Sequence, residues 1–284
     1  MAGRGGGGLE ELYSFYPWPE DYVEDPRARS RFEEALAVFD GLLEHGWLRS
    51  VVEGRERVRV VDVCGGTGLA GAALCLSLRD RGIDCDLAVN DVRRDALEKA
   101  RRLVKRVVGI EPRVVECDAR ELHRRGLRFD VALVWGFTMP HFSPFDAARL
   151  LASVAASLES HGLLLIEERD HVYTALRSGW REVVVEAIEG GRAVVSLYSG
   201  YNVFLGVFRR MVLELPTARS SVMDFRLWDV ASLAAIAWLL FEDVDFVVTK
   251  SPTIGVLMAW RPRGIDPESL AEETSIERRG RSEA

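Results

Sequence analysis

The sequence predicts an α/β protein built on a doubly wound, mostly parallel sheet that ends in an antiparallel strand pair. Short runs rich in β-branched residues alternate with helical segments between residues 58 and 167, as is typical of parallel sheets covered by helices. A glycine-rich loop follows the first of these runs. Near the end, strands at 243–250 and 253–260 are joined by Ser251-Pro252 alone, and so short a connection fits only antiparallel neighbours.

Composition limits the functions that the chain can have. Its 284 residues, 48% hydrophobic and 29% charged, suit one soluble domain of ordinary size. The formal net charge of -7 provides no basic field for nucleic acid or anionic membranes, so we expect neither as a partner. No apolar run approaches the roughly 18 residues that cross a bilayer, and the first residues do not form a signal peptide, which predicts a cytoplasmic protein.

The four cysteines show no C-x-x-C spacing, which argues against a metal site. The favoured interpretation is reduced thiols in the core, with a Cys75–Cys85 disulfide as the alternative. Glutamine is absent, and asparagine occurs only at Asn90 and Asn202. Because amide side chains are thermolabile, their scarcity predicts a thermophilic source.

The N-terminal part is predicted to consist of a flexible glycine-rich lead, residues 1–8, and a cap over residues 9–57. The aromatic segment at 12–19 has too many prolines for a helix, and we interpret it as a strap packed on the domain or as a lid over the ligands. Residues 30–48 repeat apolar side chains at helical spacing, so a helix is expected there.

The first strand and the loop after it predict a binding site. Residues 58–63 form a β-branched run that suits a strand buried on both faces. Gly65, Gly66 and Gly68 then allow a sharp turn and a close approach of the backbone to a ligand. A helix expected at 69–78 opens onto this loop, and the combination indicates a site for a nucleotide-like ligand.

Acidic residues stand at the ends of the next strands. A strand at 86–89 leads to Asp91, about twenty residues past the last glycine, where an acid accepts hydrogen bonds from ribose hydroxyls. The alternative role of Asp91 is to cap the next helix. The third strand, 113–116, is followed by Asp118, which offers an acid near an adenine edge. Asp62 lies inside the first strand, where a strand that only packs would avoid a buried charge.

With these residues, the chain resembles the class I S-adenosylmethionine (SAM) dependent methyltransferases. Their first motif commonly reads Leu-Asp-x-Gly-x-Gly-Thr-Gly, and residues 61–68 take its place as Val-Asp-Val-Cys-Gly-Gly-Thr-Gly. The departure is Cys64, where the family usually has its first glycine. The resemblance implies SAM as the cofactor and a terminal antiparallel pair that completes a seven-stranded sheet.

The resemblance also implies which residues bind the cofactor. The glycine loop faces the methionine moiety, Asp91 the ribose hydroxyls and Asp118 the adenine amine, while Asp62 orders the loop or reaches the donor's ammonium group through water. The expected cofactor-binding residues are Asp62, Cys64, Gly65, Gly66, Gly68, Asp91, Val92, Asp118, Ala119 and Trp135.

The fourth and fifth strands, expected at 129–135 and 162–167, carry loops to the edge of the sheet where ligands bind in such folds. In the first of these loops His141 is the candidate general base, because an imidazole titrates near neutrality. The alternative is a histidine that only packs. Asp170 is a second catalytic candidate, expected with His171 to line the acceptor pocket.

Beyond the fifth strand the pattern changes, and residues 178–215 are expected to form an insertion. Residues 178–188 suit either a helix or a strand, whereas 193–215 alternate like a β-hairpin outside the main sheet. This hairpin is predicted to act as a lid or as the contact of a homodimer. An apolar helix is expected at 227–240, and residues 263–284, which are charged and lack a core pattern, are expected to be a flexible tail.

The predicted function is a SAM-dependent methyltransferase, with its catalytic domain at residues 58–262, that methylates a small-molecule acceptor by in-line displacement. A sulfonium leaving group is already activated, so the protein mainly has to hold donor and acceptor close and aligned. Three alternatives stay open: an RNA or protein methyltransferase, a non-catalytic SAM-binding module, and an NAD(P)-dependent oxidoreductase, since residues 66–71 also satisfy G-x-G-x-x-G.

Overall fold

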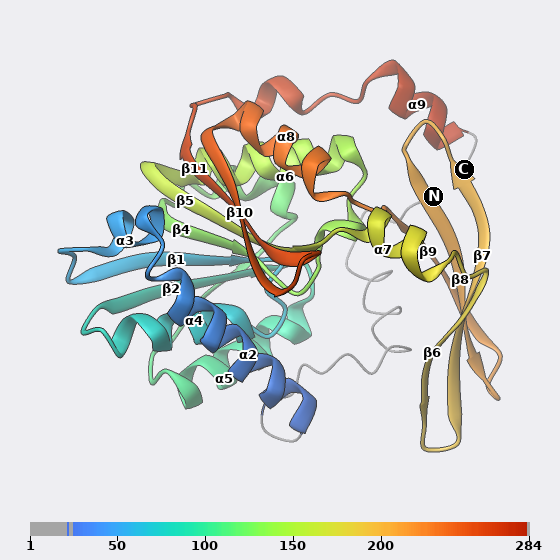
Figure 1. Cartoon of the computed structure of the whole chain (residues 1–284), viewed down its shortest axis with the longest axis horizontal. Coiled ribbons are helices and arrows are strands. Elements are labelled where there is room, and N and C mark those ends of the chain that lie inside the picture. The colour runs from blue at the N-terminus through green and yellow to red at the C-terminus, as the bar shows by residue number, and fades with distance from the viewer. Residues whose placement is uncertain (1–21, 23–24, 283–284) are drawn as a thin grey trace.

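The computed structural model describes residues 22 and 25–282 and contains two separate β-sheets (Figure 1). The predicted lead, the aromatic segment at 12–19 and the start of the cap lie outside the described residues. No helix in the described part is long and apolar enough to span a membrane.

The larger sheet has seven strands in the order β10-β11-β5-β4-β1-β2-β3, so the predicted fold class is confirmed. β1 pairs in parallel with β2 and β4, while β11 runs antiparallel to both β5 and β10. The strand order reverses at β1, and ligands bind in the crevice at such a point, outside the carboxyl ends of the strands. The seven strands are β1 (Arg57–Val63), β2 (Asp84–Asp91), β3 (Arg113–Glu116), β4 (Phe129–Val134), β5 (Leu158–Arg169), β10 (Phe241–Ser251) and β11 (Ile254–Pro262).

Helices cover both faces of this sheet (Figure 1), because side chains of successive strand residues point to opposite faces. Val58 and Val60 of β1 pack with one set of helices, and Val61 and Val63 pack with the other. Asp62 therefore points toward the first set, under the helix that follows the glycine loop. The first set is α2 (Pro26–Leu42), α3 (Gly46–Val52), α4 (Leu69–Arg79) and α5 (Arg94–Val107), and the second is η1 (Ala119–Arg125), α6 (Pro144–Ser157) and α8 (Val230–Leu240).

The smaller sheet is antiparallel throughout, in the order β6-β7-β8-β9, and shares no strand with the larger one. The predicted hairpin outside the main sheet is confirmed as β7 and β8. Residues 183–185 form a strand after α7 (His171–Ser178), because they pair with residues 195–197 of β7. The sequence does not predict β9. The four strands are β6 (Val183–Glu189), β7 (Arg192–Asn202), β8 (Val207–Leu215) and β9 (Arg219–Phe225).

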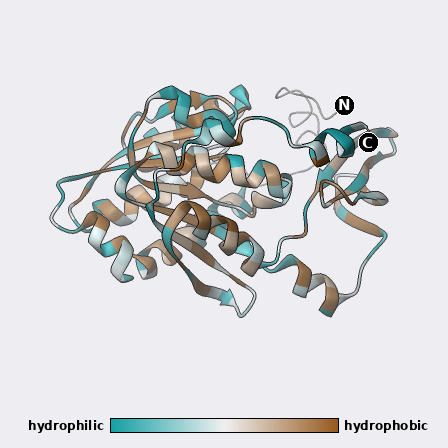
Figure 2. Cartoon of the chain, turned by 90° about the horizontal axis from the view of Figure 1, so that it is seen from above, coloured by the Kyte–Doolittle hydropathy of each residue, from teal (hydrophilic) through white to brown (hydrophobic). Residues whose placement is uncertain are grey.

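The expectation of a flexible C-terminal tail is wrong for the residues that the structure describes. η3 (Pro267–Leu270) and α9 (Ser275–Ser282) pack on the domain, and Glu277 is fully buried. Its Oε1 accepts a hydrogen bond from Nη1 of Arg149 in α6, at 2.6 Å. Figure 2 shows the helix beside the C-terminus as mainly hydrophilic, so it lacks the apolar period that predicts a packed helix. The ion pair with Arg149 and a hydrogen bond from Asn202 to the Gly280 carbonyl hold it instead.

A disulfide joins Cys75 of α4 to Cys85 of β2, so the favoured interpretation of reduced thiols is wrong for this pair. The packing of α4 on β2 brings the two Cα atoms to 5.3 Å, within the range of a disulfide. Cys64 and Cys117 are free. Among residues 22 and 25–282 there is no cluster of potential metal ligands.

Candidate active site

A cleft opens at the carboxyl ends of β1 and β4, where the strand order reverses. Its empty space, counted together with the open mouth, is about 1170 Å³. Its walls combine the glycine loop and the start of α4 with the loop after β4 and with side chains of α2 and β9. The cleft thus brings the glycine loop together with segments that are distant from it in the sequence.

The glycine loop requires glycine at two positions for steric reasons. A Cβ on Gly65 would lie 2.5 Å from Cγ of Asp62, and one on Gly68, whose φ is +72°, would lie 2.9 Å from Cγ2 of Val89. Cys64 also has a left-handed backbone, with φ 53°, at the position where the resembled motif has its first glycine. A non-glycine residue there carries strain that glycine would avoid.

Asp62 lines the cleft, although the residue is only 1% exposed. Its Oδ2 accepts a hydrogen bond from the Gly71 amide at 2.8 Å, whereas its Oδ1 has no partner within the described chain. Burial raises the pKa of Asp62 to about 7, an effect that the Gly71 amide opposes and the charge of Asp91 reinforces. Leaving a buried acceptor unsatisfied is costly, so this oxygen is suited to a donor on a ligand.

Asp91 joins the end of β2 to the glycine loop. Its Oδ2 accepts a hydrogen bond from the Gly66 amide and its Oδ1 one from the Arg93 amide, each at 2.8 Å. The alternative that Asp91 is the cap of the next helix is wrong, because Arg93 is the N-cap residue of α5. Asp91 bounds the glycine loop from the side of β2 and does not line the cleft itself.

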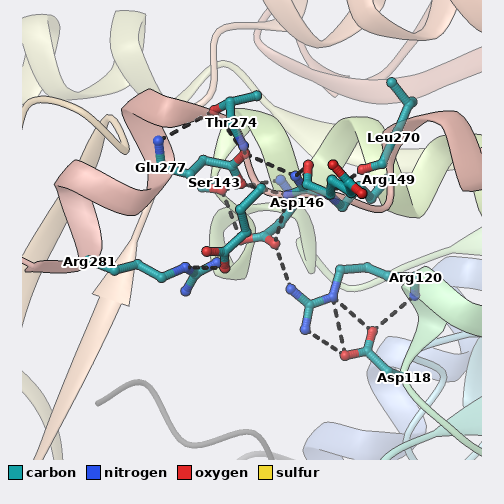
Figure 3. A network of polar contacts seen from close by, with 11 residues as sticks. Asp118, Arg120, Ser143, Asp146, Arg149, Leu270, Thr274, Glu277 and Arg281 are labelled. Atoms are coloured by element: carbon teal, nitrogen blue, oxygen red, sulfur yellow. Dashed lines mark hydrogen bonds and ion pairs between the residues drawn. The ribbon is translucent and has the colours of Figure 1, made fainter.

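Asp118 follows β3 and is the N-cap of η1. Its carboxylate accepts hydrogen bonds from the Arg120 amide and guanidinium group at 2.6 to 3.1 Å (Figure 3). Burial acts to raise the pKa of Asp118, but these hydrogen bonds outweigh it, so the pKa lies below its usual value. The guanidinium group also donates to Asp146 of α6, at 2.5 Å, and so stands between two carboxylates.

His141 ends η2 (Met139–His141) and lines the cleft with an exposed side chain. The Trp228 indole donates to the Met139 carbonyl at 2.9 Å, which ties this loop to the segment between β9 and α8. The pKa of His141 is lowered, chiefly because surrounding protein atoms displace part of the hydration of the ring although its side chain is exposed, and also because the charge of Arg93 is near. The imidazole is therefore neutral near pH 7 and able to accept a proton.

Asp170 and His171 do not line the cleft, contrary to the expectation from the sequence. Asp170 is the N-cap of α7, where its Oδ1 accepts a hydrogen bond from the Tyr173 amide at 2.7 Å and its Oδ2 one from the Val230 amide at 3.4 Å. Nε2 of His171 lies 3.1 Å from Oε1 of Glu168. The Asp170 carboxylate is thus used at the start of α7, and the His171 ring faces Glu168 of β5.

The expected cofactor residues fall into two groups. Those that line the cleft are Asp62, Cys64, Gly65, Gly66 and Trp135, and those outside its lining are Gly68, Asp91, Val92, Asp118 and Ala119. Most of the second group lies at the ends of β2 and β3, the strands next to β1 on one side.

Sequence reasoning missed several residues of the cleft. Arg31 of α2, and Met223 and Phe225 of β9, come from distant parts of the chain and carry no local signal. Arg93 also lines the cleft. Its position two residues after Asp91 is the one feature of the sequence that indicates this. Phe137 has a left-handed backbone, with φ 57°, in the loop after β4, and strain of this kind is typical of functional sites.

Comparison with known proteins supports a methyltransferase. Residues 60–162 match the family of methyltransferase domains, and no curated protein matches the chain. A SAM-dependent methyltransferase from Clostridium acetobutylicum ATCC 824 is similar in structure, with 11% identity and a TM-score of 0.59 over 80% of this chain and 92% of that chain.

Two further solved structures share the fold. The CcbJ methyltransferase from Streptomyces caelestis has 13% identity and a TM-score of 0.59, with 90% of this chain and 97% of that chain covered. SAM-bound CalS10, an amino pentose methyltransferase from Micromonospora echinaspora, has 19% identity and a TM-score of 0.52, with 83% and 94% covered. At these identities the similarity shows a common fold.

Proposed function

We propose that this chain, a class I SAM-dependent methyltransferase, transfers the methyl group to a small-molecule acceptor that binds in the cleft. The domain match and the fold support the enzyme class, and SAM is the cofactor bound to CalS10. The observation that carries the proposal is the composition of the cleft wall: Met223 and Phe225 of the smaller sheet line the same space as the glycine loop. A cleft bordered by a second sheet suits a small acceptor better than an RNA strand or a folded protein.

The cofactor is proposed to lie across the glycine loop with its methionine end at Asp62. The unpartnered Oδ1 of Asp62 supplies an acceptor for the ammonium group, directly or through water, and the backbone of residues 64–68 allows close approach. The ribose is proposed to lie at Asp91, at the end of β2. The adenine then lies beside Val92, Asp118 and Ala119, with Trp135 completing the site at the end of β4.

The reaction is proposed to be an in-line displacement in which the protein mainly aligns donor and acceptor. His141, which lines the cleft, is the proposed catalytic base and takes the proton that the acceptor loses. Its neutral imidazole supports this role, because a base must be unprotonated at the working pH. Asp170 is not proposed as a catalytic residue, because its carboxylate caps α7.

CalS10 acts on an amino pentose, and an acceptor of that size is proposed here. A homodimer through the smaller sheet is part of the proposal. Three valines of this sheet are exposed, namely Val183 (56%), Val185 (57%) and Val222 (62%). Exposed apolar side chains that gather on one surface commonly mark a contact with another protein.

Calorimetry with SAM, its demethylated product and NAD tests the cofactor, and a screen of metabolites with methyl-labelled SAM tests the reaction. We expect SAM and its product to bind, NAD not to bind, and the label to pass to a small molecule. Tighter binding of NAD than of SAM would support the oxidoreductase alternative. Label in RNA or protein would support the RNA or protein methyltransferase. SAM binding without any transfer would support the non-catalytic SAM-binding module.

A further inference from the structure

Three arginines from separate elements surround the loop after β4. Arg31 of α2 and Arg93, just before α5, line the cleft. Nη2 of Arg31 lies 3.1 Å from the position that a Cβ on Gly136 would take. Arg169 ends β5, and its guanidinium carbon lies 5.1 Å from the centroid of the Phe137 ring, which itself lines the cleft. Arg31 and Arg93 therefore bring guanidinium groups into the lining, while Arg169 lies against Phe137 and outside the lining itself.

Arg169 differs from the other two because its charge is unpaired. Within residues 22 and 25–282, its side chain makes no hydrogen bond or ion pair, and its Nε is buried without an acceptor. The neighbouring carboxylate, Glu168, is turned to His171 and to the main-chain amide of Arg169. Because solvent does not reach this Nε, an anionic oxygen would meet the Nη groups of the same guanidinium, which have no partner among the described residues.

Among the described residues, none of the carboxylates near these arginines forms an ion pair with Arg169. Within the described lining, Asp62 is the only carboxylate. Oδ1 of Asp91 lies 3.4 Å from Nε of Arg93. Oε1 of Glu167, on β5, lies 3.5 Å from Nζ of Lys250. The lining of the cleft thus has more cationic side chains, Arg31 and Arg93, than anionic ones, in a chain whose net charge is -7.

We propose that the methyl acceptor is an anion, held through a carboxylate or phosphate group by Arg169 beside Phe137. The end of β5 is separated from β2 by β4 and β1, so Arg169 lies away from the proposed ribose site and is placed for the acceptor. The sulfonium of SAM is positively charged, and an anionic acceptor balances that charge in the cleft. Met223 and Phe225 supply an apolar surface for the body of the acceptor.

This inference rests on the proposed function, and the experiment separates the two. Enzyme saturated with S-adenosylhomocysteine, the demethylated cofactor, is titrated by calorimetry with benzoate, phenyl phosphate and benzyl alcohol, which share a ring and differ in charge. We expect at least one anion to bind about 10-fold or more tightly than benzyl alcohol, and added salt to weaken it. Comparing benzoate with phenyl phosphate distinguishes a carboxylate acceptor from a phosphorylated one.

Variants of Arg169 assign the anion preference to this side chain. Arg169→Met removes the charge and keeps a long apolar chain on Phe137, whereas Arg169→Lys keeps the charge and loses the planar guanidinium. In the Met variant we expect the anion and benzyl alcohol to bind within about 2-fold of each other, and in the Lys variant part of the preference to return. Arg113→Met is the control, because Arg113 is exposed at the start of β3, at the opposite end of the sheet.

Thermal melting establishes that each variant is folded before it is titrated. Equal binding of anions and benzyl alcohol by the wild type, an unchanged preference in Arg169→Met, or no anion binding at all would overturn the inference. In each of these cases S-adenosylhomocysteine still binds, and the proposed function stands. Failure of S-adenosylhomocysteine itself to bind would overturn the proposed function, and this inference with it.

Discussion

At Gly65 the glycine loop has room for a hydrogen atom but not for a methyl group. We expect Gly65→Ala to weaken SAM binding by at least about 10-fold and to destabilise the fold by about 1–3 kcal/mol, since its Cβ would lie 2.5 Å from Cγ of Asp62. Gly46→Ala is the matched control, because nothing lies within 4 Å of its Cβ position. Calorimetry and urea unfolding measure the two effects. Wild-type affinity in Gly65→Ala would show that the loop shifts freely to accept a side chain.

Asp62 is expected to make SAM binding depend on pH. The pKa of Asp62 is raised to about 7 in the free protein, and the ammonium group of SAM favours the ionised carboxylate. Binding below that pH therefore releases a proton, and affinity should rise with pH by up to about tenfold per unit and level off above about 7. Calorimetry in buffers of different ionisation enthalpy counts the proton.

The matched variant, Asp62→Asn, should bind SAM more weakly and without this pH dependence. The same pH dependence of binding in Asp62→Asn would show that another group releases the proton.

The raised pKa of Asp62 also predicts how the stability of the free protein depends on pH. An acid whose folded pKa lies above its unfolded value contributes stability at low pH, and this contribution is lost as the pH rises from about 4 to about 7.

His141 is tested by the rate of methyl transfer at saturating SAM, where the titration of Asp62 no longer contributes. The pKa of His141 is lowered from 6.5, so the wild-type rate should fall on an acidic limb below that pH. We expect His141→Ala to lose this limb together with roughly 10²–10⁴ in rate. A variant that keeps both would show that the cleft catalyses by alignment alone.

At the level of elements, α9 links the two sheets. Arg149 of α6 donates to both carboxylate oxygens of Glu277, at 2.6 and 2.9 Å (Figure 3). One turn further along α9, Nδ2 of Asn202, the last residue of β7, donates to the Gly280 carbonyl at 2.7 Å. This helix therefore connects the smaller sheet to the larger domain, although most of its side chains are polar.

Replacing the buried carboxylate of α9 should destabilise the fold. We expect Glu277→Gln to cost about 2–4 kcal/mol in urea unfolding, because it takes from Arg149 its nearest and fully buried carboxylate and leaves only Asp146, at 3.8 Å. Glu268→Gln is the control: Glu268, on η3, pairs with Arg124, and both side chains are 49% exposed, so the loss should be much smaller. Equal losses from the two variants would contradict the role assigned to burial.

For the whole molecule, the smaller sheet is expected to set the oligomeric state. The strand register places Val185, Val195 and Leu213 in one row across β6, β7 and β8, with no charged side chain in it. We expect a dimer by light scattering and a monomer with unchanged SAM affinity for Val185→Glu. Val248→Glu is the control, since Val248 is equally exposed on β10 of the other sheet. A monomeric wild type would refute the proposed dimer.

Short-range patterns in the sequence predict the larger sheet and one side of the candidate site. Strands buried on both faces leave continuous apolar runs, and the helices between them repeat at their own period. β1, the glycine loop and α4 are consecutive in the chain, so the sequence also places Asp62 beside Gly65. These features depend on neighbours that are close in sequence, which is why a linear pattern reveals them.

The other side of the site depends on contacts between distant segments. β9 is a strand because it pairs with β8, and α9 is held by an arginine 128 residues away. Arg31, Phe225 and Arg169 meet the loop after β4 only when α2, β9 and β5 are packed around it. Periodicity shows which side of a segment is buried but not which segment covers it, so the acceptor side of the cleft is defined only in the folded chain.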